Sequence, residues 1–213
     1  MAARLKDLPA DAGTFWQRPP ARDHGDEKPE PLWQAIGSSL TSFEMLEDVF
    51  GTLFRVLVES PSPAAGRAYG AISSARGRRE ALEAAAEIFF SRHNVSQDWQ
   101  DEFSLLMKHF AHASGRRNEI AHSVSIKYIG YVDEEHDSSV GHFLTPPQYN
   151  TRKTYAFRRS LDEDKWAHLR AKYRYTASDV SEITSRFLHL HGVASEWLMN
   201  FWIKHGPASE TGE

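Results

Sequence analysis

Apolar residues recur every three or four positions along several stretches of the chain, which is the spacing of one face of an α-helix. Residues 32–59 show it first, at Ile36, Leu40, Phe43, Phe50, Phe54 and Leu57. Pro61 and Pro63 follow this stretch. Because proline lacks a backbone donor and clashes with the preceding turn, these prolines predict the end of a first long helix.

Further helices are predicted before the middle of the chain. Three glycines interrupt the helical pattern of residues 64–92, and Ser73-Ser74 can cap a restart within it. Residues 96–114 have an uninterrupted apolar stripe and predict another helix. Gly115 follows, and we expect it to break that helix.

The helical spacing of apolar residues is lost in the next part of the chain. Residues 125–132 are rich in β-branched and aromatic side chains and predict a strand. A polar stretch, 133–139, is expected to turn the chain, so that residues 140–144 return as its partner. Residues 153–158 and 171–175 can add further extended pieces.

The last helix has the most regular pattern. Its apolar positions keep a spacing of three or four residues at Val180, Ile183, Phe187, Leu190, Ala194, Trp197 and Phe201. Thr176 offers a capping hydroxyl, with the Asp179 carboxylate three residues on, and Gly206-Pro207 ends the pattern. The predicted fold is mainly α, a bundle of four to five helices with a small β-hairpin insertion, about 125–175, before the last long helix.

The two ends of the chain differ from this bundle. Residues 1–31 hold half of the chain's 10 prolines and include a run without any apolar side chain. Such a segment buries too little surface to offset its ordering entropy, so we predict a disordered, Pro-rich tail in which only Phe15-Trp16 can anchor. One helical domain is predicted at residues 32–205, followed by a flexible C-terminus at 206–213.

Composition narrows the class of protein. The chain has 213 residues, of which 40% are hydrophobic, enough for the core of one domain. It has no cysteine, which excludes a disulfide framework, Cys-ligated zinc and thiol catalysis, and fits a cytoplasmic location. No apolar stretch has the length of a signal peptide or a membrane span, so we expect no membrane association. The net charge of −4 argues against bulk attraction to nucleic acid but permits a local basic site.

Candidate chemistry is concentrated in residues 116–122, Arg-Arg-Asn-Glu-Ile-Ala-His. We expect this motif to open a short helix at about 116–124. Arg117 can bind phosphate oxygens through two N–H groups, and the imidazole of His122 can transfer protons near neutral pH. Asn118 can position a water or a phosphate oxygen, or hold His122 in one tautomer.

This set of residues resembles the motif of HEPN domains, in which an Arg and a polar residue precede a His by a few positions. Here the three are Arg117, Asn118 and His122. HEPN domains are helical bundles, and many act as dimeric, metal-independent endoribonucleases. The resemblance implies cleavage of single-stranded RNA through 2'-hydroxyl attack, without a cofactor. It also implies a role such as a toxin, a phage-defence effector or an RNA processor, with an antitoxin or another regulatory protein as a partner.

The spacing of these residues on a helix also suggests that a second copy of the chain is needed. Asn118 and His122 are four residues apart and share a helix face, whereas Arg117 and His122 point about 140° apart. Either Arg117 sits at a frayed first turn of the helix, or the site is completed from elsewhere. One chain also offers one histidine at the motif for two proton transfers. A homodimer that faces two motifs supplies both proton-transfer groups, so we expect a composite active site.

Basic residues elsewhere suggest where RNA would lie. Arg116 can assist on a phosphate, and a second group is interleaved with aromatic side chains: Arg152, Lys153, Arg158 and Arg159. Cations mixed with aromatic rings suit single-stranded RNA, whose bases stack while its phosphates pair. The alternative is ordinary solvated surface, which the neighbouring run Asp162-Glu163-Asp164 would balance.

Other interpretations stay open. Arg117 and His122 can simply be a solvated cation and a packed imidazole at a helix end. Two histidine pairs, His109 with His112 and His189 with His191, have no carboxylate at a metal-site spacing, so we expect no metal. The main alternative function is a non-catalytic helical module that binds a protein partner or RNA. A small-molecule sensor would need an enclosed apolar pocket among the helices.

Overall fold

Three long helices dominate the computed structural model: α2 (Glu30–Leu57), α5 (Gln97–Ala121) and α7 (Ala177–His205). The structure describes residues 5–20, 22–60, 62–129, 140–147, 155–157 and 169–206. The shorter helical elements are η1 (Leu5–Asp7), α1 (Ala12–Phe15), α3 (Pro63–Gly70) and α4 (Ala75–Arg92). The predicted mainly helical fold, with a β-hairpin before the last long helix, is confirmed.

The structure divides into two compact units. The first comprises Met1–Trp16, Ser42–Ser114 and Arg186–Glu213, and the second comprises Gln17–Thr41 and Gly115–Ser185. The segment predicted as one helical domain, 32–205, therefore contributes to both units. None of the helices in the described ranges combines the length and the apolar composition that crossing a bilayer requires.

Aromatic rings fill the core of the first unit. The rings of Phe50 in α2 and Phe110 in α5 are 4.1 Å apart between centroids. The ring of Phe201 in α7 lies 4.9 Å from Trp197 on the same helix and 5.5 Å from Phe89 in α4. These residues belong to the apolar stripes of the sequence, and each fully buried side chain contributes about 1.5–3 kcal/mol to folding.

The N-terminal residues pack against this core. Trp16 is 2% exposed, and its indole Nε1 donates to Nδ1 of His109 at 3.1 Å. Asp11 caps α1 by accepting from the backbone N–H groups of Gly13 and Thr14. The prediction of a disordered tail at residues 1–31 is therefore wrong for the described residues, because burial of Trp16 and a capped helix offset the ordering entropy.

His109 is buried and has a defined tautomer. Its Nε2 lies 2.8 Å from the carbonyl oxygen of Pro9, which can only accept, so Nε2 carries the proton. Nδ1 is then the acceptor for Trp16. Burial lowers the pKa of His109, and nearby His112 and His189 lower it further, against the opposing hydrogen bond to Pro9. The neutral ring thus joins α5 to Pro9 and to Trp16 in the N-terminal residues.

The structure confirms one predicted helix boundary and contradicts another. Ser74 caps α4 by accepting from the backbone N–H of Gly77 at 3.0 Å, which confirms the predicted restart. In contrast, α5 continues through Gly115 to Ala121, so the predicted break and the separate helix at 116–124 are wrong. A mid-helix glycine costs only about 1 kcal/mol, which burial of flanking side chains such as Phe110 and Ile120 can offset.

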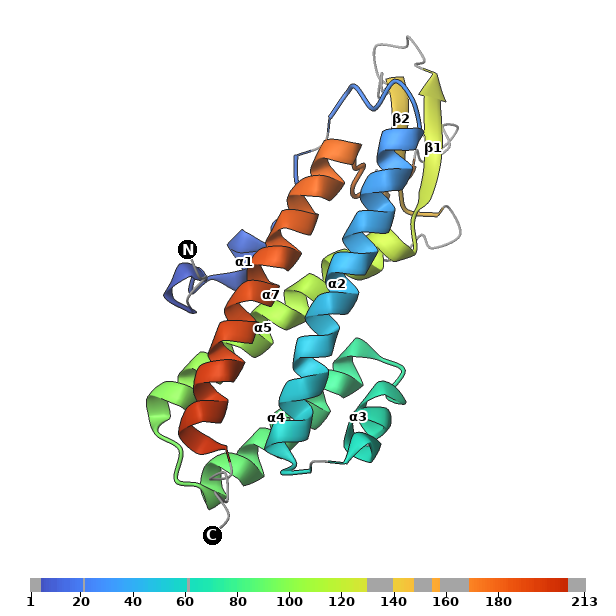
Figure 1. Cartoon of the computed structure of the whole chain (residues 1–213). Helices are drawn as coiled ribbons and strands as arrows, with labels where there is room; N and C mark the ends of the chain where they lie inside the picture. The colour runs from blue at the N-terminus through green and yellow to red at the C-terminus, as the bar shows by residue number, and fades with distance from the viewer. Residues whose placement is uncertain are drawn as a thin grey trace. The chain divides into compact units, whose positions relative to one another are not determined.

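A β-hairpin lies in the second unit. Strands β1 (Val124–Ile129) and β2 (Val140–Thr145) run side by side and antiparallel (Figure 1). The residues predicted to turn between them, 133–139, lie outside the described part of the chain. A second antiparallel pair joins β3 (Tyr155–Phe157) to β4 (Leu169–Ala171).

Residues of the predicted tail extend this hairpin. The backbone N–H of Gly25 donates to the Val140 carbonyl at 2.7 Å, and Asp26 pairs with His142 in both directions. A Cβ on Gly25 would lie 2.5 Å from the His142 carbonyl oxygen, so only glycine fits this approach. Residues 24–26 are thus part of the fold of the second unit.

The start of α7 is held by the predicted cap. Thr176 N–H donates to the Asp179 carboxylate at 2.9 Å, and Asp179 N–H approaches the Thr176 hydroxyl at 3.3 Å. Asp179 is fully buried and also accepts from Nε of Arg22 at 3.0 Å. The helix ends at His205, as predicted from Gly206-Pro207, and the rest of the predicted flexible C-terminus, 207–213, lies outside the described residues.

Replacing Trp16 tests whether the N-terminal segment belongs to the fold. Trp16→Ala is expected to lower the free energy of unfolding by about 3–5 kcal/mol, because it removes a buried aromatic ring and leaves a cavity. Trp33→Ala, at a side chain that is 56% exposed, is the matched control and should cost about 1 kcal/mol or less. Urea denaturation measures both, and equal values would mean that residues 5–16 do not stabilise the fold.

His109 predicts a pH dependence of stability. Its pKa is lower in the folded than in the unfolded chain, so its contribution is complete above the unfolded pKa of about 6.5 and is lost as pH falls through the folded value. Denaturation between pH 7.5 and 5 should therefore show a steeper loss of stability in wild type than in His109→Gln. Parallel pH profiles of the two proteins would contradict a lowered pKa of His109 in the folded chain.

Candidate functional site

Residues 116–122 lie at the C-terminal end of α5, in the second unit, and not at the start of a helix. The backbone N–H of His122 donates to the carbonyl of Asn118 at 3.1 Å, so the helical turn extends to the histidine. Asn118 and His122 are exposed, and Arg117 is half-buried. Nη1 of Arg117 donates to Oδ1 of Asn118 at 3.3 Å, which joins two of the three predicted catalytic residues.

The regular helix keeps Arg117 and His122 on different faces. Five residues of α-helix turn a side chain by about 140° relative to the first, and α5 is helical through Ala121. Arg117 therefore has no frayed first turn in which to swing toward His122. Asn118 and His122 are one turn apart on one face, as their spacing predicts.

Arg116 belongs to a polar network around Glu119. Its Nη1 is 2.8 Å from Oε2 of Glu119, and the two side chains are 16% and 13% exposed. Nη2 of Arg18 lies 2.6 Å from Oε1 of the same carboxylate, and the Tyr175 hydroxyl donates to Oε2 at 2.6 Å. The predicted role of Arg116 on RNA phosphate would require it to leave this ion pair.

Two tyrosines complete the network. The rings of Tyr173 and Tyr175 stack with centroids 4.8 Å apart, and the Tyr173 hydroxyl lies 2.9 Å from Oγ of Ser123. Burial, and then the charge of Glu119, raise the pKa of Tyr175, so its hydroxyl stays a neutral donor. Burial also raises the pKa of Tyr173.

This network holds the backbone that carries His122. Oγ of Ser123, the next residue, donates to the Glu119 carbonyl at 2.5 Å and so closes the last turn of α5. Arg18, Tyr173 and Tyr175 were not among the predicted site residues. Two features of the sequence point toward this network: the three-residue spacing of Arg116 and Glu119, and the tyrosines at every second position before α7. Neither feature shows which elements lie next to one another.

The remaining predicted RNA-binding residues, Arg152, Lys153, Arg158 and Arg159, lie outside the described residues. The histidine pairs considered for metal have other surroundings: His109 is bound to Trp16 and Pro9, and Nε2 of His189 lies 3.4 Å from the Asp7 carbonyl. Across the described ranges, no three His, Cys, Asp or Glu side chains gather closely enough to hold a metal ion.

No protein-family model, curated protein or solved structure matches this chain. The function therefore rests on what the residues of this site can do. What they provide is an exposed imidazole and amide one turn apart, a neighbouring guanidinium joined to that amide, and a buried ion-pair network that fixes the helix end. These groups can bind a phosphate and transfer a proton.

Loss of Glu119 is expected to destabilise the second unit. Glu119→Ala leaves Arg18 and Arg116 without their shared carboxylate, which should lower the free energy of unfolding by about 2–3 kcal/mol, less than for a fully buried pair because Arg18 is partly exposed. Glu80→Ala removes the exposed pair with Arg76 and serves as the control, with a much smaller expected loss because water screens an exposed pair. Urea denaturation compares them, and a loss no larger than that of the control would show that the network is not a structural anchor.

Proposed function

We propose that this protein is a metal-independent endoribonuclease of HEPN type that cleaves single-stranded RNA as a homodimer. The observation that carries the proposal is the exposure of Asn118 and His122 on one face of the last turn of α5, with Arg117 bonded to Asn118. A histidine that merely packs would be expected to lie buried with both ring nitrogens bonded, as His109 is.

The proposed reaction is a transesterification within the RNA strand. Neutral His122 takes the proton of a ribose 2'-hydroxyl, and the 2'-oxygen attacks the adjacent phosphorus. Arg117 donates to the non-bridging oxygens as their negative charge increases, and Asn118 positions one of them. The bond to the 5'-oxygen breaks, and that oxygen takes a proton from an acid, which leaves a 2',3'-cyclic phosphate and a free 5'-hydroxyl.

Helix geometry supports a site built from two copies. Arg117 and His122 of one chain diverge by about 140° on α5, so one copy presents its guanidinium and imidazole in different directions. A second copy can place its own guanidinium opposite His122. The partner subunit's His122 would then supply the acid for the leaving 5'-oxygen, which gives one histidine for each proton transfer.

Cleavage by purified protein in EDTA tests the proposal. His122→Ala is expected to lower the rate on single-stranded RNA by about 100-fold or more, because it removes the proton-transfer group. His112→Ala replaces another exposed histidine of α5 and should leave the rate unchanged. The rate per chain should also fall on dilution, because the site needs two copies. Circular dichroism confirms that each variant is folded.

Other results would count against a nuclease. Equal cleavage by wild type and His122→Ala would identify a contaminating enzyme or a different site. A folded wild type that leaves single-stranded RNA intact across a range of sequences would favour the second candidate function, a helical module that binds a protein partner.

One feature favours that second candidate. The solvent-facing side of α7 in the first unit carries apolar side chains in place of charges: Leu188, Met199, Trp202 and Ile203 are 45%, 65%, 46% and 75% exposed. Gly192 and Ser195 lie between them on the same face. Exposed apolar residues at helical spacing are typical of a surface that packs against another helix.

A further inference from the structure

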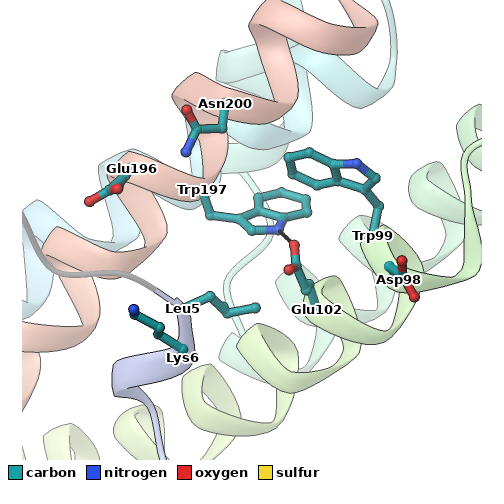
Figure 2. Close-up of a pocket in the computed structure, with 8 residues that line it drawn as sticks. All are labelled: Leu5, Lys6, Asp98, Trp99, Glu102, Glu196, Trp197 and Asn200. Atoms are coloured by element: carbon teal, nitrogen blue, oxygen red, sulfur yellow. Dashed lines mark hydrogen bonds between the residues drawn. The ribbon is translucent and has the colours of Figure 1, made fainter.

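The first unit contains a cavity whose lining combines carboxylates with indole rings. It has a volume of about 630 Å³ and is partly open to solvent. Figure 2 shows its lining residues, which come from η1, α5 and α7: Leu5, Lys6, Asp98, Trp99, Glu102, Glu196, Trp197 and Asn200. This size is within the range of pockets that hold small organic ligands.

The charge of the cavity is negative. Asp98, Glu102 and Glu196 contribute three carboxylates, and Lys6 contributes the one cation among the described residues of the lining. Oε2 of Glu196 is buried and has no hydrogen-bond partner among the described residues. A buried carboxylate oxygen without a donor is costly, so this oxygen needs a donor that the described part of the chain does not supply.

The indole rings give the cavity a second reason to prefer cations. Trp99 and Trp197 pack edge to face, with centroids 5.5 Å apart, and Nε1 of Trp197 donates to Oε2 of Glu102 at 2.9 Å. Figure 2 marks this hydrogen bond with a dashed line. That bond holds Glu102 in place. Nζ of Lys204 already lies 5.5 Å from the centroid of Trp99, so this ring does attract an ammonium group.

The arrangement suits an extended ligand better than a single ion. These carboxylates do not gather around one point, because no three acidic or histidine side chains of the described residues are placed to share a metal ion. Charges spread along a cavity match a chain whose ammonium groups are separated by methylenes. The methylenes would lie on the indole rings while each ammonium group meets a carboxylate.

We propose that this cavity binds a linear alkyl polyamine. One ammonium group pairs with the carboxylate of Glu196 from its accessible side, a second pairs with Glu102 or with Asp98 at the rim, and the alkyl chain lies along the indole rings. Lys6 lies in the same lining and competes with the ammonium groups of the ligand for these carboxylates. Nothing in this site depends on the proposed nuclease residues, so it can be tested separately.

Isothermal titration calorimetry of the full chain with spermidine tests the proposal. Spermidine should bind more tightly than butylamine or Mg²⁺ at the same ionic strength, because neither control offers several ammonium groups on one chain. Glu196→Gln should weaken spermidine binding about tenfold, since it removes one close charge pair. Lys6→Gln should tighten binding, because it removes the competing cation. Glu87→Gln, at an exposed carboxylate of α4, should bind spermidine as wild type does.

Each contrary result would overturn the site. Equal affinity in wild type, Glu196→Gln and Glu87→Gln would mean that spermidine responds to the overall charge of −4 and not to this cavity. Weaker binding in Lys6→Gln would contradict competition between cations. If Glu196→Gln does not fold, Asp98→Asn at the exposed rim takes its place, with a smaller expected loss of affinity. Tight binding of butylamine would reduce the ligand to a single ammonium group and so refute a polyamine site.

Discussion

The second unit depends on the ion pairs and the hydrogen bond that the Glu119 carboxylate makes. Guanidinium groups from Arg18 and Arg116 approach its two oxygens, and the Tyr175 hydroxyl donates to one of them. These partners come from the N-terminal segment, from α5 itself and from the residues before α7. A half-buried carboxylate needs such partners because removal from water is costly. The same contacts therefore join three distant parts of the sequence and fix the end of α5, where the candidate catalytic residues lie.

The N-terminal segment shows how composition can mislead about order. It is rich in proline and charge, which is typical of a disordered tail. However, Trp16 is buried beside His109 in the first unit, and Arg22 reaches the buried Asp179 in the second. In each unit a few specific contacts offset the ordering entropy of a polar stretch. Neutral His109 makes the contact in the first unit depend on pH.

Two kinds of chemistry are proposed for this chain, and they use different residues. The RNA-cleaving residues are carried by the last turn of α5 in the second unit, where a helix of regular geometry keeps Arg117 and His122 apart. The polyamine cavity lies in the first unit and uses carboxylates and indoles of η1, α5 and α7. Because the two sets share no residue, loss of one activity would leave the other proposal intact.

Patterns within single segments determined much of the fold. The apolar stripes predicted the long helices, Ser74 and Thr176 predicted two caps, and β-branched residues predicted the hairpin, because each of these depends on neighbours within a few positions. The four-residue spacing of Asn118 and His122 likewise predicted their shared face. The prediction that Gly115 ends the helix was wrong, because a glycine inside a helix costs little free energy and burial of neighbouring residues keeps α5 continuous.

Only the tertiary structure decided which distant residues meet. Arg18 and Glu119 are 101 positions apart in the chain, and Trp16 and His109 are 93 apart, so no pattern of short period connects them. The same holds for Glu102 and Trp197, which line the cavity from α5 and α7. The sequence thus determined which side chains are available and on which face of a helix they lie. Packing determined that Arg116 is engaged by Glu119, that His122 is exposed, and that carboxylates and indoles share a cavity, because these depend on free energies gained only when separate elements come together.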